Sequence, residues 1–391
     1  MAEGEQIAVR VLERIRDVSA EQWDACAGDD PFLSHAFLDA LEESQSAVAE
    51  EGWLPHHLAV EQGGRLIAAA PLYVKGHSYG EYVFDWSWAN AFHRAGQSYY
   101  PKLQCCVPFT PVGGNRLLVH PEADHDKYAA ALVGAMVELT ERMDLSGAHL
   151  SFLNQRQWEL CGEVGLLQRV GVQYHWHNDG YSTYDDFLDA LVARKRKNLR
   201  KERKQAAASG VELVTLTGEQ ITREHWTAFY GFYRNTIDRK WGSAYLTKDF
   251  FHILGDTMPE RVVLVMGRHE GHWIAGALNL RGDEAIYGRY WGCLERYNAL
   301  HFEVCYHRAI DFAIEHGLKR VEAGAQGQHK IQRGYVPVET FSAHYLAHPD
   351  FRVAISDYLE RERATMREDI AQLTAQSPFR EDRARARSCA E

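Results

Sequence analysis

The stretch that decides the fold is residues 262–292, "VVLVMGRHEGHWIAGALNLRGDEAIYGRYWG". It consists of three mainly apolar runs, and the polar turns "RHEGHW" and "RGDE" separate them. Short apolar runs that alternate with glycine-containing turns are typical of antiparallel strands joined as hairpins. The stretch therefore predicts three consecutive strands.

Residues 56–84, "HHLAVEQGGRLIAAAPLYVKGHSYGEYVF", repeat this order of strand, turn, strand, turn and strand. In both halves two helical segments precede the strands. In both halves a further helix follows, "DKYAAALVGAMVELTERM" or "ALHFEVCYHRAIDFAIEHG", and leads into the strand "GAHLSFL" or "LKRVEAG". A duplicated unit explains the repetition.

The fold class that we expect is α/β (α+β), with two tandem domains, each a mixed and mostly antiparallel sheet flanked by helices. We place the first domain at residues 1–180 and the second at 181–355. Residues 356–391 should form a C-terminal helix and a disordered tail, because "FREDRARARSCAE" has no apolar period.

Composition narrows the class of protein. The chain has 391 residues, of which 46% are hydrophobic, so it can bury a sizeable core. Its net charge of −11 argues against non-specific binding of nucleic acid by the whole surface. The N-terminus lacks the pattern of a secretory signal, and no apolar run is long enough to span a membrane. Seven cysteines without a CxxC motif fit reduced thiols. We expect a cytoplasmic protein.

The second half resembles the FemAB-type peptidoglycan-bridge aminoacyl transferases, a family of tandem GNAT-fold domains. The similar segments are "LVARKRKNLRKERKQAAASGVEL", "FYRNTIDRKWGSAYLTKDFFHIL", "WIAGALNLRGDEAIYGRYWG" and "VEAGAQGQHKIQRGYVPV". The first-half stretch "EYVFDWSWANAFHRAGQSYYPKLQCCVPFTPVGG" resembles bacterial FemAB-like proteins of peptidoglycan biosynthesis or recognition, predicted to be N-acyltransferases. Together these segments cover most of residues 1–350.

The resemblance implies an N-acyltransferase whose donor is an aminoacyl-tRNA and whose acceptor is an amine of a peptidoglycan precursor or small molecule. An acyl-CoA donor is the alternative. GNAT-fold enzymes that use acetyl-CoA usually hold its pyrophosphate on a glycine-rich turn before a helix. The corresponding segment here, "CLERYNALHFEV", contains no glycine. A non-catalytic protein that binds peptidoglycan precursors is a further alternative. We expect no tightly bound cofactor and no metal site, and the oligomeric state stays open.

The segment "RKRKNLRKERK", residues 194–204, carries eight Lys or Arg residues and one acid, Glu202. It belongs to a predicted helix that begins with the capping pair Thr183 and Asp186 and ends at Gly210. One interpretation is a solvated surface. The other, which depends on the resemblance, is that Arg196, Lys197, Arg200 and Lys201 neutralise the phosphates of a tRNA acceptor stem or a nucleotide-linked precursor.

The segment "RVEAGAQGQHKIQRGYVPVET", residues 320–340, combines three glycines with charged side chains and reads as strand, loop and strand. From the residues alone it is a turn with solvated cations. The resemblance instead implies a site for substrate contact and transfer. Lys330 or Arg333 would then stabilise the oxyanion or the leaving 3′-oxygen, and Glu322 or His329 would accept the amine proton. Gln326 would contact substrate.

The segment "FDWSWANAFHRAGQSYYPKLQ" in the first half is rich in aromatic residues. It is either core or a wall that binds the acceptor where the two domains meet. The second interpretation gives substrate-binding roles to Asp85, Trp88, Tyr100 and Lys102. Tyr290, in "GRYWG", would belong to the opposite wall, although such a tyrosine is more often a core residue.

Overall fold

The computed structural model describes residues 7–239, 242–325 and 327–380, which form two compact units. Unit 1 contains the chain up to Gly171, together with residues 245–250 and 339–367. Unit 2 contains Val172–Ala244, Phe251–Val338 and the chain from Glu368 onward. The units differ from the expected continuous ranges 1–180 and 181–355, because the chain after Val338 contributes a strand and most of a helix to unit 1.

Unit 1 contains two sheets. Strands β1, β3, β4 and β7 are antiparallel neighbours in that order, and β2, β5, β6, β8 and β15 form a mixed series in which β6 and β8 are parallel. The strands are β1 (Ile7–Leu12), β2 (Trp53–Pro55), β3 (His57–Gln62), β4 (Arg65–Ala70), β5 (Leu72–Lys75), β6 (Lys102–Cys105), β7 (Leu118–Val119), β8 (Gly147–Leu153) and β15 (Val336–Leu346). The helices are α1 (Ala20–Ala27), α2 (His35–Glu43), α3 (Trp86–Arg94), α4 (His125–Arg142), α5 (Gln155–Glu163) and α12 (Pro349–Thr374).

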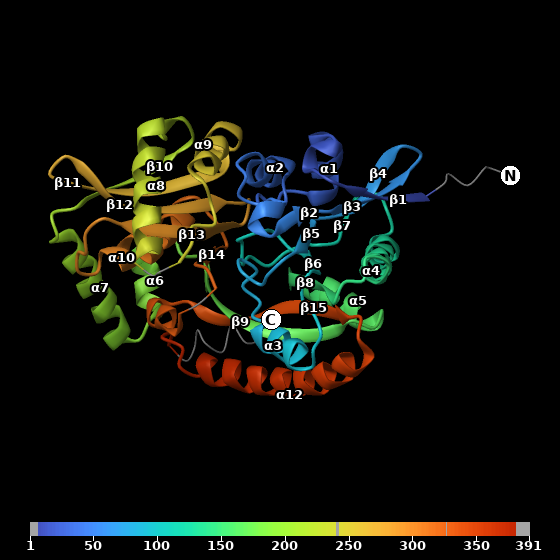
Figure 1. Cartoon of the computed structure of the whole chain (residues 1–391). Helices are drawn as coiled ribbons and strands as arrows, with labels where there is room; N and C mark the ends of the chain where they lie inside the picture. The colour runs from blue at the N-terminus through green and yellow to red at the C-terminus, as the bar shows by residue number, and fades with distance from the viewer. Residues whose placement is uncertain (1–6, 240–241, 326, 381–391) are drawn as a thin grey trace. The chain divides into compact units, whose positions relative to one another are not determined.

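Unit 2 is built on one mixed series of strands in the order β10, β11, β12, β13, β14 and β9, in which β13 and β14 are parallel (Figure 1). The strands are β9 (Leu167–His177), β10 (Glu212–Thr217), β11 (Val262–His269), β12 (His272–Arg281), β13 (Ala285–Cys293) and β14 (Arg320–Glu322). The helices are α6 (Tyr184–Ala190), α7 (Ala193–Ala207), α8 (Arg223–Asp238), α9 (Lys248–Thr257), α10 (Leu300–Phe302) and α11 (Arg308–Glu315).

The predicted repetition is confirmed. Unit 1 follows the order β1, α1, α2, β3 to β5, α4 and β8, and unit 2 follows the order β10, α8, α9, β11 to β13, α11 and β14. One detail was wrong, because residues 81–84 form no strand. The third strand of that set is β5, which Pro71 separates from β4 and which pairs with β6. The tail predicted from "FREDRARARSCAE" begins too early, because Phe379 is buried and Arg380 donates a backbone hydrogen bond to Ala190. Residues 381–391 lie outside the described residues.

The helix expected at 299–317 is interrupted. A turn of π-helix spans Glu303–His307, between α10 and α11. Gly317 ends the run after His316 with a φ of 65°, as the glycine position predicts. Single turns of π-helix inside α-helices are frequent at functional sites.

Helix α8 packs unusually close to β13, and Gly292 permits this. A Cβ atom at Gly292 would lie 2.2 Å from the backbone carbonyl of Phe232 in α8. We expect Gly292→Ala to lower the free energy of unfolding by about 1–3 kcal/mol, because the helix must move away from the strand. Urea denaturation is the measurement. Gly134→Ala in α4 is the control, since a Cβ there meets nothing within 4 Å and alanine favours helix, so its stability should not fall.

Candidate active site

A fork between two parallel strands forms a pocket in unit 2. Strands β13 and β14 pair only over Ala285–Tyr287 and Arg320–Glu322. Beyond that point β13 continues to Cys293, whereas the other strand ends. The pocket at the fork has a volume of about 120 Å³, and its lining includes Asn279, Gly288, Tyr290, Cys305, Tyr306 and Gly324. Sites for whole ligands usually measure ~300–1,000 Å³, so this pocket can hold one small group of a substrate.

Lys330 is buried next to this pocket. Gly327 and Gly334, both at positive φ, bound a 3₁₀-helix over Gln328–Arg333, where the sequence predicted a loop and a strand. Only 1% of the Lys330 side chain is exposed, and its Nζ donates a hydrogen bond to the Gly324 carbonyl at 2.8 Å. Burial lowers the pKa of Lys330 to about 8, with Cys305 acting in the opposite direction. A lysine with this pKa can both carry charge and donate a proton near neutral pH.

His329 reaches the same pocket through Tyr306. Its Nε2 lies 3.0 Å from the Tyr306 hydroxyl, which comes from the π-helical turn. Burial, together with Arg333 and Lys330, lowers the pKa of His329. A neutral imidazole at physiological pH can accept a proton, so this position fits the base role that the resemblance implied. The sequence did not single out Tyr306, because its spacing reads as ordinary helix.

Glu322, the other candidate base, is already paired. Its Oε1 accepts a hydrogen bond from Arg320 Nε at 2.8 Å, and His175 Nε2 lies 3.6 Å from its Oε2. The residue is 4% exposed. Because Arg320 occupies one carboxylate oxygen and the residue is buried, the geometry favours His329 over Glu322.

Arg333 is also buried and paired. Its guanidinium donates to both carboxylate oxygens of Glu202, at 2.9 and 2.5 Å, and lies 3.5 Å from the ring centre of Phe302. These contacts fit a structural link better than the substrate contact that the resemblance implied. Tyr290 lines the pocket and packs edge-on against Tyr233. Gln326 lies outside the described residues.

The aromatic segment of unit 1 forms a buried polar cluster rather than an open wall. Trp88 is 3% exposed, Lys102 is fully buried and Asp85 is 2% exposed. The Lys102 ammonium donates to Glu81 at 2.7 Å and to Asp85 at 2.5 Å. Tyr100 is half-buried. The core interpretation therefore fits Asp85, Trp88 and Lys102, whose side chains are sealed from solvent.

The same cluster contains groups that sequence reasoning missed. The Tyr99 hydroxyl donates to Asp85 at 2.6 Å and lies 3.3 Å from His149. His149 in turn lies 2.9 Å from His344, and burial lowers the pKa of both histidines. The aromatic segment, His149 and His344 lie far apart in the sequence, so no local pattern could have indicated their contact.

The helix predicted between Thr183 and Gly210 folds as two helices, not one, and the basic segment lies in the second. The capping pair Thr183 and Asp186 starts α6 as predicted, but α6 ends at Ala190 and α7 begins at Ala193. Backbone hydrogen bonds from Val192 to Pro378 and from Arg380 to Ala190 stabilise the break between α6 and α7.

Helix α7 divides its side chains among three stripes. One stripe faces the unit: Lys195 contacts Gln332, Leu199 and Ala206 are buried, and Glu202 binds Arg333. A second stripe is ion-paired, with Arg196 on Asp189, Arg200 on Asp185 and Arg203 on Asp311. The third contains Arg194, Lys197, Lys201 and Lys204, which are exposed and for which we find no ion pair within the described part of the chain. We call these four residues the open stripe.

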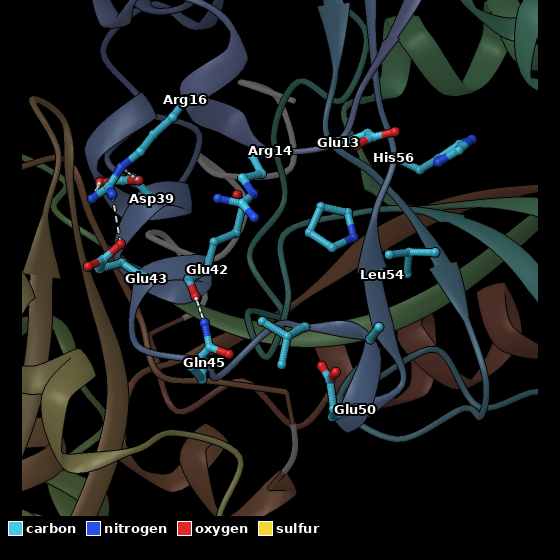
Figure 2. Close-up of a pocket in the computed structure, with 13 residues that line it drawn as sticks. Glu13, Arg14, Arg16, Asp39, Glu42, Glu43, Gln45, Glu50, Leu54 and His56 are labelled. Atoms are coloured by element: carbon cyan, nitrogen blue, oxygen red, sulfur yellow. Dashed lines mark hydrogen bonds and ion pairs between the residues drawn. The ribbon is translucent and has the colours of Figure 1, made fainter.

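One cavity of unit 1 has the wrong charge for an anionic donor. It measures about 590 Å³, and five carboxylates line it, those of Glu13, Asp39, Glu42, Glu43 and Glu50. Figure 2 shows that Arg16 points toward Asp39 and Glu43, so its charge is neutralised locally. Of the two regions, the open stripe of α7 is the one that suits a polyanion.

No helix among the described residues is long and apolar enough to cross a membrane.

Comparisons with known proteins agree with this architecture. A family described as peptidoglycan biosynthesis/recognition, FemAB-like, matches residues 14–381. The crystal structure of FemX is 13% identical, with 87% of this chain and 98% of that chain aligned at a TM-score of 0.55. A conserved protein of unknown function from Bacteroides thetaiotaomicron is 10% identical, with 87% and 100% aligned at a TM-score of 0.51. None of the curated proteins compared with the chain matches it significantly.

At these sequence identities the similarity to solved structures shows only that the fold is shared. The family match covers more than nine-tenths of the sequence and so shows the family. The chain therefore belongs to the FemAB-like family of peptidoglycan biosynthesis/recognition, and its fold is similar to that of FemX.

Proposed function

We propose that this chain transfers an aminoacyl group from tRNA to an amine of a peptidoglycan-precursor type of acceptor in the cytoplasm. The fork of unit 2 would be the reaction site. The observation that carries the choice of donor is the open stripe of α7, because a row of exposed cations on one helix face suits consecutive phosphates of an RNA backbone.

The proposed chemistry needs no covalent enzyme intermediate. The acceptor amine attacks the ester carbonyl, a C–N bond forms, and His329 takes the amine proton. The Lys330 ammonium stabilises the oxyanion and then protonates the 3′-oxygen as the C–O bond breaks. Proton transfer from acceptor to leaving group is thereby balanced, since His329 can pass the proton to solvent and Lys330 can be recharged from it.

Two alternative functions, transfer from acyl-CoA and binding without catalysis, make different predictions. An acyl-CoA donor would need a phosphate-binding turn before α10. However, the segment at that position, residues 293–304, contains no glycine. A non-catalytic precursor-binding protein would bind the acceptor without releasing deacylated tRNA. The lack of glycine there favours the tRNA donor over CoA, and the buried Lys330 favours catalysis over binding alone.

Removal of two open-stripe charges should weaken tRNA binding. We expect Lys197→Gln with Lys201→Gln to raise the Kd for unfractionated tRNA about tenfold and to lower the slope of log Kd against log salt by about 2. Fluorescence anisotropy over a salt series measures both quantities.

Arg196→Gln with Arg200→Gln is the matched control, because it removes the same two charges from the ion-paired stripe. Its effect on Kd should stay within about threefold, since those charges are already neutralised. Equal weakening by both pairs would mean that net charge alone, and not the open stripe, attracts the RNA.

A further inference from the structure

A chain of buried polar contacts connects α7 to the segment that carries Lys330. The only acid between residues 194 and 204 is Glu202, and it points away from the open stripe. Its Oε1 and Oε2 accept hydrogen bonds from Arg333 Nε and Nη2. Because both oxygens are used, the pair fixes the angle between the helix and the segment as well as their distance.

Arg333 connects Glu202 to His329, the candidate base. Its Nη1 donates to the His329 carbonyl at 2.8 Å, so the same guanidinium binds Glu202 and the backbone beside Lys330. The Phe302 ring lies against the guanidinium and shields it from water. Arg333 is 6% exposed, and a buried ion pair in such surroundings is strongly coupled to the positions of its partners.

His307 anchors Glu202 from the other side. Glu202 Oε1 accepts a hydrogen bond from His307 Nε2 at 2.7 Å, and His307 Nδ1 lies 2.7 Å from the Tyr184 hydroxyl. His307 belongs to the π-helical turn that also supplies Tyr306 to the pocket. Burial opposes ionisation of Glu202, but the hydrogen bonds from His307 and Arg333 lower its pKa overall. Glu202 is therefore a carboxylate at neutral pH.

We propose that Glu202 is a positioning residue that couples RNA binding on the open stripe to the placement of Lys330 and His329. The open stripe and Glu202 lie on opposite faces of one helix, and a helix transmits a displacement as a rigid body. Lys195, two turns before Glu202, contacts Gln332 in the same 3₁₀-helix, so α7 holds that segment at two points. The inference rests on the proposed tRNA donor.

Hydrogen–deuterium exchange of peptides that cover Gln328–Gly334, with and without unfractionated tRNA, tests the coupling. In the unmodified protein we expect tRNA to slow exchange in this segment about threefold or more. RNA bound to the open stripe restrains α7, and the contacts of Glu202 with Arg333 then restrain the 3₁₀-helix. Glu202→Gln keeps the size of the side chain but removes its charge. We expect it to abolish the slowing while its Kd for tRNA stays within about threefold.

Asp311→Asn is the matched control, because the Asp311 carboxylate also holds α7, by accepting hydrogen bonds from Arg203 rather than from the 3₁₀-helix. It should retain the tRNA-dependent slowing. If Glu202→Gln does not fold, Arg333→Lys, which keeps the charge but loses the two-point contact, should give the same loss. Undiminished slowing in the Glu202 or Arg333 variant would overturn the coupling alone. Failure of tRNA to bind the unmodified protein would instead overturn the proposed donor, and the coupling with it.

Discussion

Lys330→Ala should lower the rate of aminoacyl transfer by a factor of roughly 10²–10³, the usual loss when one donor to a developing oxyanion is removed. The ammonium lies beside the fork and is held by the Gly324 carbonyl, so its loss leaves the pocket without this cation. Single-turnover transfer from aminoacyl-tRNA is the measurement, with thermal unfolding as a check on the fold. A Lys330→Ala protein with full activity would remove Lys330 from the mechanism.

The pKa of Lys330 also predicts the direction in which the transfer rate changes with pH. Lys330 is protonated below its pKa of about 8, so the step that it assists should slow as the pH rises through that value. Arg stays charged throughout this range. Lys330→Arg should therefore move the loss of activity to higher pH, even if its geometry lowers the maximum rate. An unchanged alkaline limb in this variant would assign the titration to another group.

Lys102→Met should lower the free energy of unfolding by about 3–5 kcal/mol, because it leaves two buried carboxylates without their cation. Glu81 and Asp85 both accept from the Lys102 ammonium and are at most 3% exposed. Denaturant unfolding at fixed pH is the measurement. Lys127→Met on the exposed face of α4 is the control and should change stability by less than about 0.5 kcal/mol.

The contact between Lys102 and Glu81 should also affect how the free energy of unfolding depends on pH. Burial raises the pKa of Glu81 to about 7, although Lys102 lowers it. The folded state therefore binds more protons than the unfolded state between Glu81's ordinary pKa and 7, so Glu81 contributes stability that is lost as the pH rises through 7. In Lys102→Met this loss should extend to higher pH, because the cation no longer favours the carboxylate. Identical pH profiles would show that the lysine and the acid are not coupled.

Periodic and local features were predictable from the sequence. Three apolar runs with glycine-containing turns specified β11 to β13, and the same pattern recurred in unit 1. Thr183 with Asp186 marked the start of α6, and Gly317 marked the end of α11, because caps depend on residues close in the chain.

Features that depend on distant partners were not predictable. The break between α6 and α7 depends on backbone bonds to residues 378–380, and "DALVARKRK" contains no helix breaker. The burial of Lys330 and Lys102 depends on acids, carbonyls and aromatic rings elsewhere in the chain. The composition of α7 showed eight cations but not which of them are paired, since Asp185, Asp189 and Asp311 lie outside the segment.

The most direct test of the account is transfer of a labelled amino acid from bulk charged tRNA to a UDP-linked muramyl peptide by the purified protein, with labelled acetyl-CoA and longer acyl-CoAs in parallel. We expect label to reach an amine of the acceptor only with the charged tRNA, in a reaction that prior RNase treatment abolishes and that Lys330→Ala slows. Transfer from an acyl-CoA alone would contradict the proposed donor. Tight binding of the muramyl peptide with no transfer from any donor would contradict catalysis at the fork.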